Sequence, residues 1–213
     1  VNTNVLDLPS TFSIVDLDDD GYYLCIAATE NKISGNLQIN TGNKIYFWDT
    51  ASNSWQREWS IPTAFISSIH KLGSTMYAIC SDGLYAFNFS TPPTLVVPLS
   101  NSDGPIRTGG VQSTSQTATV KDGVLYWLSS GGDVCAFGSP IPGLSPRFYK
   151  PFKAFSGGDS SLLTSVGKFR LYTGDNTEYG YIDTVTGGNT SITAETIYLP
   201  LGRKWDIKRI EII

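Results

Sequence analysis

Strand-like segments recur along this chain with a period of about fifty residues, and this repeat constrains the fold more than any other feature. Each period contains four short apolar or alternating segments, separated by Gly, Asn, Asp and Pro, a pattern typical of β-strands. The second segment of each period has a turn glycine followed by a tyrosine. The four tyrosines, spaced 54, 49 and 46 residues apart, are Tyr23, Tyr77, Tyr126 and Tyr172.

A four-stranded sheet of this length has two apolar faces and can bury neither of them alone, so such sheets stack around an axis. Four strands per period is the signature of a β-propeller. We therefore predict an all-β fold, a single β-propeller domain over residues 1–213 built from four-stranded antiparallel blades. A β-sandwich or an elongated β-rich viral domain is the alternative. The predicted blades are residues 9–62, 63–105, 106–156 and 157–200, with closing strands at 1–8 and 203–213.

The repeat leaves the size of the ring open, because the chain makes either about four blades with a closing pair or a part of a larger ring. The sequence begins with Val1 and shows no signal peptide, which favours a processed chain or a segment of a longer one. No run approaches the roughly 18 apolar residues of a membrane helix. A net charge of −4 argues against strong nucleic-acid binding. Three cysteines without C-x-x-C spacing predict buried free thiols.

The segment from Asp16 to Gly21, with the sequence DLDDDG, is the sharpest local motif. Carboxylates at alternate positions before a glycine match the start of a calcium loop, so Asp16, Asp18 and Asp20 are candidate calcium ligands. The context resembles the calcium-loop repeats of integrin-type propellers, but their ninth position falls on Leu24 here, and the twelfth position of an EF-hand falls on Ala27. An acidic hairpin turn without metal is the alternative interpretation. No other cofactor is predicted.

Residues 44–55, with the sequence KIYFWDTASNSW, resemble the hairpin between the third and fourth strands of a kelch blade. The same segment is similar to hairpins of bacteriophage virion propellers, including tail hub and portal-associated head-completion proteins. The resemblance implies a short polar turn and an indole, that of Trp55, packed between blades. The kelch double glycine is absent from the second strands, so the resemblance is confined to this hairpin.

The C-terminal segment adds to the bacteriophage resemblance, because such propellers often end in an aliphatic strand, a glycine, a basic pair and a basic–aliphatic strand. Four basic residues supply this pattern and are candidate interaction residues: Arg203, Lys204, Lys208 and Arg209. An edge strand that is protected by charge from aggregation is the alternative.

Motifs of catalysis are missing from the sequence. There is no G-x-S-x-G elbow and no phosphate-binding loop, and His70 is the single histidine, in a predicted innermost strand. Residues 29–43, 101–116 and 140–146 are predicted to be loops between strands, where a rigid scaffold presents its contacts.

These features favour a non-enzymatic virion protein, such as a phage tail, hub or portal-associated component. Its partners would be other virion structural proteins, with a homo-oligomer as an open possibility, and its location would be the virion. A carbohydrate- or receptor-binding propeller, extracellular or on a cell surface, is the alternative. In that case a cluster of aromatic side chains would stack on a glycan receptor, unless it packs between blades: Tyr46, Trp48, Trp55 and Trp59. A hydrolase on the same scaffold is a third hypothesis, without local support.

Overall fold

Fifteen β-strands and no helix are formed by the residues that the computed structural model describes. These residues are 6–34, 37–105, 117–131, 133–139, 144–153, 162–166, 170–174 and 179–183. They therefore contain no helix of the length and apolar character that a membrane span requires.

The strands form four antiparallel sheets, and in each sheet the strands pair in chain order. Sheet 1 contains β1 (Phe12–Asp19), β2 (Leu24–Ser34), β3 (Leu37–Trp48) and β4 (Arg57–Ser60). Sheet 2 contains β5 (Ile66–Leu72), β6 (Thr75–Cys80), β7 (Gly83–Phe87) and β8 (Thr94–Pro98). Sheet 3 contains β9 (Ala118–Lys121), β10 (Val124–Leu128), β11 (Asp133–Gly138) and β12 (Arg147–Lys153). Sheet 4 contains β13 (Leu162–Val166), β14 (Arg170–Gly174) and β15 (Tyr179–Asp183).

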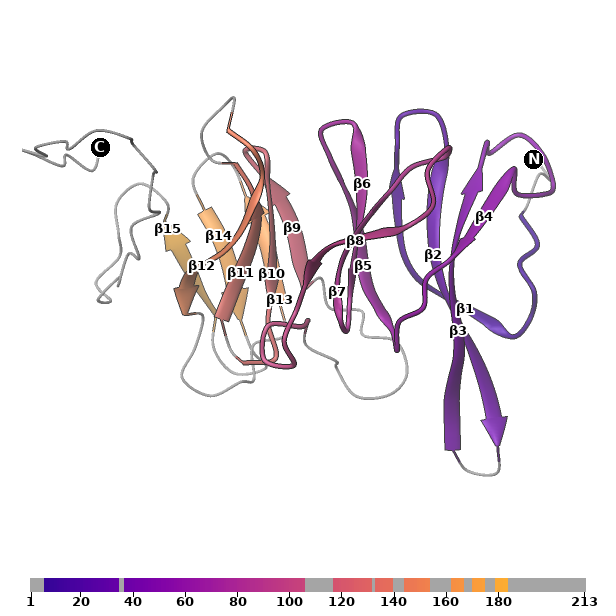
Figure 1. The fold of residues 1–213 in the computed structure, drawn as a ribbon, viewed down its shortest axis with the longest axis horizontal. Helices are drawn as coiled ribbons and strands as arrows, with labels where there is room; N and C mark the ends of the chain where they lie inside the picture. Colours follow the sequence, from indigo (N-terminus) through magenta and orange to yellow (C-terminus); the bar gives the residue numbers. More distant parts are fainter. Residues whose placement is uncertain are drawn as a thin grey trace, which may run out of the picture.

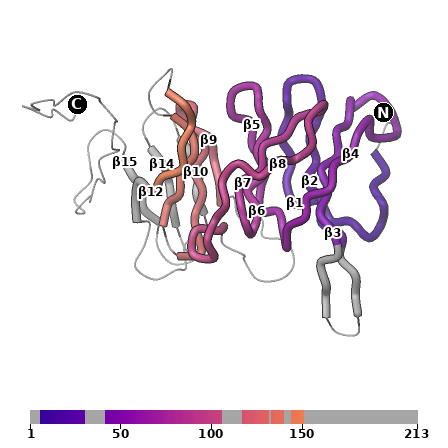
Figure 2. The backbone as a smooth tube through the Cα atoms, in the orientation of Figure 1, coloured from indigo at the N-terminus to yellow at the C-terminus, as the bar shows by residue number. Residues whose placement is uncertain are grey.

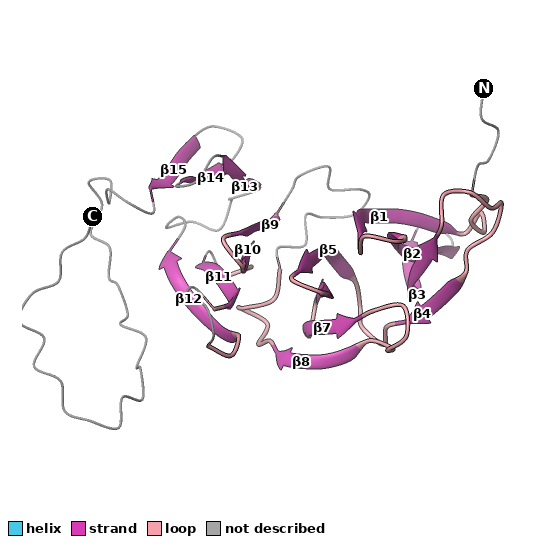
Figure 3. Ribbon diagram, turned by 90° about the horizontal axis from the view of Figure 1, so that it is seen from above, coloured by secondary structure: helices cyan, strands magenta, loops and turns pink. Residues whose placement is uncertain are grey.

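The sheets follow one another in chain order, and they stand side by side (Figures 1 and 2). The first strands of successive sheets contact one another, β1 with β5, β5 with β9 and β9 with β13. Seen from above, these first strands line the inner side of an open arc, and β4, β8 and β12 lie on its outer side (Figure 3). This radial arrangement of antiparallel sheets confirms the predicted fold class.

Apolar faces pack between neighbouring sheets, as the repeat predicts. Sheets 1 and 2 share a core that includes Ile45 and Phe47 from β3 together with Ile69 from β5, all fully buried. Sheets 2 and 3 share a second core that includes Ile79 from β6 and Trp127 from β10. The three cysteines lie in these cores as buried free thiols, which confirms that prediction.

The longest strands, β2 and β3, occupy much of the segment 29–43, for which a loop was predicted. The two strands continue their antiparallel pairing past the edge of sheet 1, as far as the Ser34–Leu37 pair. They form a two-stranded arm that extends away from the arc (Figure 1). Pairing of the two segments satisfies the backbone groups that an irregular loop would leave to solvent. The prediction of a loop here is therefore wrong.

Candidate functional site

The aspartates of the DLDDDG motif lie along β1, on the inner side of the arc, next to β5 of sheet 2. Asp16 accepts two backbone hydrogen bonds: Oδ1 from the N–H of Leu17 at 2.9 Å and Oδ2 from the N–H of Ile69 at 2.8 Å. Each carboxylate oxygen thus contacts a different sheet. Asp16 bridges the inner edges of sheets 1 and 2.

Asp18 repeats this arrangement two residues further along β1. Its Oδ1 accepts the N–H of Asp19 at 2.8 Å, and its Oδ2 accepts the N–H of Lys71 at 2.7 Å. Side chains two residues apart lie on the same face of a strand, and alternate N–H groups of an edge strand point away from its sheet. The Asp-x-Asp spacing of β1 therefore matches the spacing of unpaired N–H groups on β5. We call Asp16 and Asp18 with their β5 partners the carboxylate clasp.

Asp20 has a different role, at the turn that follows β1. Its Oδ1 accepts the N–H groups of Tyr22 and Tyr23, both at 2.8 Å, which closes an Asx-type turn around Gly21. Gly21 has a φ of +101°, a conformation that side chains rarely adopt. The main-chain oxygen of Asp20 accepts a hydrogen bond from Lys71 Nζ at 2.7 Å. The turn is thereby attached to the same strand as the clasp.

His70 lies in β5 between the two clasp contacts, as its predicted position in an innermost strand implies. Its Nε2 is buried and has no hydrogen-bond partner among the described residues. Burial lowers the pKa of His70, while the nearby Asp16 and Asp18 carboxylates oppose that shift. Burial also raises the pKa of Asp16, against the effect of the N–H group of Ile69. Burial therefore disfavours the charged form of both His70 and Asp16, which lie close together at this edge.

The calcium interpretation of Asp16, Asp18 and Asp20 stays a prediction. In the structure, their carboxylates accept six hydrogen bonds from backbone N–H donors, and an N–H group and a cation compete for the same carboxylate oxygen. No group of three or more His, Cys, Asp or Glu side chains that could hold a metal ion occurs in the described ranges. Sequence reasoning missed the backbone role, because β5 lies some fifty residues away from the motif.

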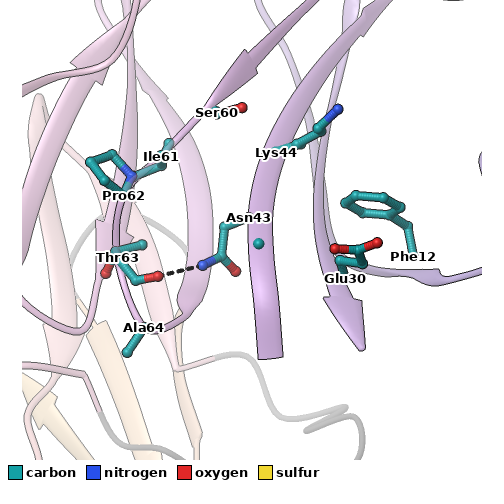
Figure 4. A pocket seen from close by; sticks show the side chains of 10 residues that line it. Phe12, Glu30, Asn43, Lys44, Ser60, Ile61, Pro62, Thr63 and Ala64 are labelled. Carbon is teal, nitrogen blue, oxygen red and sulfur yellow. Dashed lines mark hydrogen bonds between the residues drawn. The ribbon is translucent and has the colours of Figure 1, made fainter. Parts of the chain in front are cut away.

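A pocket of about 530 Å³ lies where the arm leaves sheet 1 (Figure 4). Asn43 anchors its wall: Oδ1 accepts the hydroxyl of Thr29 at 2.8 Å, and Nδ2 donates to the main-chain oxygen of Thr63 at 2.6 Å. The mouth combines an aromatic ring, a carboxylate and an amine. The lining residues are Phe12, Glu30, Gly42, Asn43, Lys44, Ser60, Ile61, Pro62, Thr63 and Ala64.

The two charged side chains that line this pocket, Lys44 and Glu30, contact neighbouring groups. Lys44 Nζ lies 2.7 Å from Glu58 Oε1 and 5.6 Å from the centroid of the Phe12 ring. Glu30 Oε1 accepts a hydrogen bond from the Thr11 hydroxyl at 3.4 Å. A carboxylate and an amine beside an aromatic ring are suited to a polar ligand that has an apolar face. The sequence offered no signal for this pocket, because its walls come from four separate segments.

The kelch-like hairpin forms the polar turn that its resemblance implies. Asp49 Oδ1 accepts the N–H groups of Ala51 and Ser52, both at 2.9 Å, and these bonds lower the pKa of Asp49. The indole of Trp55 packs on Tyr46, with ring centroids 5.0 Å apart. This cluster lies on the face of sheet 1 that is turned away from sheet 2. Among the described residues Trp55 packs on its own sheet, and its expected packing between two blades stays a prediction.

The other aromatic candidates for sugar stacking are also engaged in packing. Tyr46 is fully buried, and its burial near Glu58 and Glu30 raises its pKa to about 12. Trp48 donates its indole N–H to the main-chain oxygen of Ser52 at 2.7 Å. Trp59 donates its indole N–H to the main-chain oxygen of Asn88, just after β7 of sheet 2, at 3.0 Å. These side chains therefore do not form one exposed platform.

Several predicted features fall outside the described residues. These are the basic candidates Arg203, Lys204, Lys208 and Arg209, the closing strand at 203–213, and most of the closing strand at 1–8. In the predicted closing strand at 1–8, Leu6 and Leu8 are described, and both pack on the aromatic cluster of sheet 1.

Comparison with known proteins supports the fold. No protein-family model and no curated protein sequence matches this chain. Among solved structures, the computationally designed Ika4 protein is similar, with a TM-score of 0.53 and 9% identity over 84% of this chain and 95% of that one. The Dos1 propeller has a TM-score of 0.53 and 12% identity over 79% of this chain and 41% of that one. The chain therefore spans less than half of the Dos1 structure. The fold is that of a β-propeller.

Proposed function

We propose that this chain is a non-enzymatic interaction module of a virus particle, a tail, hub or portal-associated component that binds other structural proteins. A propeller scaffold of this kind suggests a role in protein interaction, because rigid sheets hold the connecting segments that contact partners. Fold alone does not assign a function, so the proposal depends on particular features of this chain.

The observation that carries the proposal is the β2–β3 arm. Its strands have 11 and 12 residues, whereas β6 and β7 in sheet 2 have 6 and 5. The extra length extends past the edge of sheet 1 (Figure 1). A two-stranded projection of this kind offers the backbone groups of its outer edges to another protein. The kelch-like hairpin with Asp49 and Trp55, similar to hairpins of phage virion propellers, supports the virion setting.

Removal of the arm tests the proposal. A variant in which residues 31–41 are replaced by a two-residue turn keeps the rest of β2 and β3. We expect it to fold but to be missing from virus particles purified from the cells that produce the chain, as measured by mass spectrometry. The matched control is Tyr22→Ser, at the β1–β2 turn, where Tyr22 is 90% exposed. Absence of the wild-type chain from particles, or normal incorporation of the shortened variant, would contradict the proposal.

A carbohydrate- or receptor-binding role is the second candidate, and the pocket beside Asn43 favours it. Sugar recognition combines hydrogen bonds to hydroxyl groups with packing against an aromatic ring, and the pocket offers Glu30, Lys44 and the ring of Phe12. Glycan-array binding, measured with and without calcium, tests this role. We expect any binding to be lost in Phe12→Ala and kept in Tyr22→Ser. An array without binders, or binding unaffected by Phe12→Ala, would count against the pocket.

A further inference from the structure

Arg57, in the outer strand β4 of sheet 1, lies against two aromatic rings. Its guanidinium carbon is 5.0 Å from the centroid of the Trp59 ring and 4.9 Å from that of the Phe89 ring. Trp59 belongs to the same strand, whereas Phe89 follows β7 of sheet 2. The side chain of Arg57 is half-buried, and β4 lies on the outer side of the arc (Figure 3). Attraction to two ring faces restricts the position of the cation at an accessible edge of the molecule.

Both rings are themselves held in place. The indole N–H of Trp59 donates to the main-chain oxygen of Asn88 at 3.0 Å. The ring of Phe89 stacks on that of Tyr23, with centroids 4.4 Å apart and planes within 8° of parallel. These contacts come from both sheets, so the fold fixes the surroundings of the guanidinium. Much of the side-chain entropy that an arginine loses on binding a ligand is therefore already lost in the folded chain.

The guanidinium has donors that the described residues do not use. An arginine side chain carries five N–H donors, and Arg57 makes no hydrogen bond or ion pair within the described part of the chain. The adjacent carboxylate of Glu58 points to the opposite face of β4, where it lies 2.7 Å from Lys44 Nζ. A half-buried cation of this kind gains most from an oxyanion, which restores the hydrogen bonds that burial has removed.

A carboxylate matches this site better than a phosphate group. The planar fork of a guanidinium donates two parallel hydrogen bonds to a carboxylate, whereas phosphate groups on proteins are recognised by clusters of arginines. Arg57 has no second cation to help it, because every lysine whose side chain is described has an oxygen partner. These lysines are Lys44, Lys71, Lys121 and Lys150. One cation between two rings suits a group with one negative charge on an apolar stem.

We propose that Arg57 binds a carboxylate of a partner polypeptide, from an acidic side chain or from the end of the chain, while Trp59 and Phe89 contact the apolar carbons beside it. Arg57 pairs with Phe47, near the end of β3 that is remote from the β2–β3 arm. The site is therefore separate from the arm, and it does not depend on the proposed virion setting.

Nuclear magnetic resonance titration of the full chain at low ionic strength tests the proposal, with the indole N–H signal of Trp59 as the reporter. Three unlabelled peptides of six residues are the probes. The first contains glycine and glutamate and has an amidated end, the second contains glycine and glutamine and has a free carboxylate end, and the third is the second peptide with an amidated end. We expect saturable shifts with the first peptide, the second or both, which identifies the source of the carboxylate, and none with the third.

Substitution of Arg57 measures its part in this binding. We expect Arg57→Gln to weaken binding of the carboxylate peptides about tenfold or more. Arg57→Lys should lie between Arg57→Gln and the wild type, because lysine keeps the charge but lacks the planar fork. The matched control is Arg147→Gln, because Arg147 is an exposed arginine of β12 without a ring contact among the described residues. It should bind as the wild type does, and circular dichroism verifies that all three variants are folded.

Four results would overturn the proposal. The first is the absence of saturable shifts with both carboxylate peptides, and the second is an equal response to the amidated glutamine peptide. The third is equal affinity in the wild type and in folded Arg57→Gln, or an equal loss in Arg147→Gln. The fourth is tighter binding of inorganic phosphate than of either carboxylate peptide, which would assign the site to phosphate groups instead.

Discussion

Asp16 and Ile69 belong to different sheets, and the carboxylate of the first accepts the backbone N–H of the second at 2.8 Å. With the parallel contact between Asp18 and Lys71, this bond satisfies the inner edge of β5, which would otherwise expose unpaired donors. The clasp therefore provides a polar connection between sheets 1 and 2, beside the apolar core that the two sheets share.

Removal of one clasp carboxylate should destabilise the chain. Asp16→Ala and Asp18→Ala each leave partly buried N–H groups without an acceptor, and we expect each to lower the free energy of unfolding by about 1–3 kcal/mol. Asp16→Asn keeps one acceptor oxygen and should lower the free energy of unfolding by less. The exposed Asp19 is the matched control, because its side chain makes no clasp contact and Asp19→Ala keeps the main-chain N–H. Urea denaturation measures these differences, and equal stability of Asp16→Ala and Asp19→Ala would contradict the role of the clasp.

Stability should depend on pH through His70, the single histidine of the chain. Burial lowers its pKa in the folded protein, so the folded state favours the neutral imidazole, whereas the unfolded chain protonates near pH 6.5. The stabilising contribution is therefore complete above about pH 6.5 and is lost as the pH falls through the folded pKa. The raised pKa of Asp16 acts in the opposite direction, with a contribution that is lost as the pH rises through its folded pKa.

Urea denaturation at a series of pH values between about 7.5 and 5.5 measures this dependence. We expect the free energy of unfolding to fall toward the acidic end by at most about 1.4 kcal/mol per pH unit, the limit for one proton. His70→Gln should flatten the profile over this window. A slope that is unchanged in His70→Gln would show that another group causes it.

Calcium binding by the DLDDDG motif has a direct thermal test. Because backbone N–H groups already contact the carboxylates of Asp16, Asp18 and Asp20, we expect millimolar calcium to leave the melting temperature unchanged. A ligand that binds only the folded state raises that temperature. A rise with calcium that is absent with magnesium and lost in Asp18→Asn would instead support the calcium site.

The repeat in the sequence predicted the strands well where local pattern decides the structure. Strands β6, β11 and β15 each coincide with one of the short apolar or alternating segments of the repeat, because such a run between turn residues leaves little freedom. The arm was not predicted, since residues 31–41 are mostly polar and resemble a loop. Its two strands pair with each other along their whole length.

The role of the clasp was hidden from the sequence for a different reason. Alternate aspartates before a glycine suit a cation and a row of N–H donors equally well, because both need carboxylate oxygens at regular spacing. The choice depends on what lies next to β1, and β5 comes from residues some fifty positions later. The pocket beside Asn43 depends in the same way on Thr29 and Thr63, which the sequence does not bring together.

The three thiols should be unreactive in the folded protein. Burial raises the pKa of Cys25 and of Cys135 to about 12 and also raises that of Cys80, so little thiolate forms at neutral pH. We expect a chromogenic disulfide reagent to label none of the three thiols rapidly in buffer and all of them in denaturant. Rapid labelling of one thiol in buffer would reveal local opening of the sheet that contains it.

Two glycines with positive φ, Gly73 in the β5–β6 turn and Gly138 at the end of β11, should differ in their tolerance of a side chain. Gly73 and Gly138 have φ values of +64° and +150°, which other residues adopt only with strain. A Cβ at Gly73 would meet no atom within 4 Å. Gly73→Ala should therefore lower the free energy of unfolding only through backbone strain, by about 1 kcal/mol. A Cβ at Gly138 would lie 2.6 Å from the main-chain oxygen of Gly123, in the β9–β10 turn, and 2.8 Å from Cα of Val124, which is paired with Gly138.

Backbone held in a sheet cannot move aside as a flexible side chain does, so Gly138→Ala should cost about 3 kcal/mol or more. Urea denaturation of the two alanine variants compares them on the same scale. The difference between them measures the close approach of β10 and β11 together with the larger backbone strain at a φ of +150°. Similar losses of stability in the two variants would mean that β11 can shift away from β10 at Gly138, and that sheet 3 is less tightly paired than its register implies.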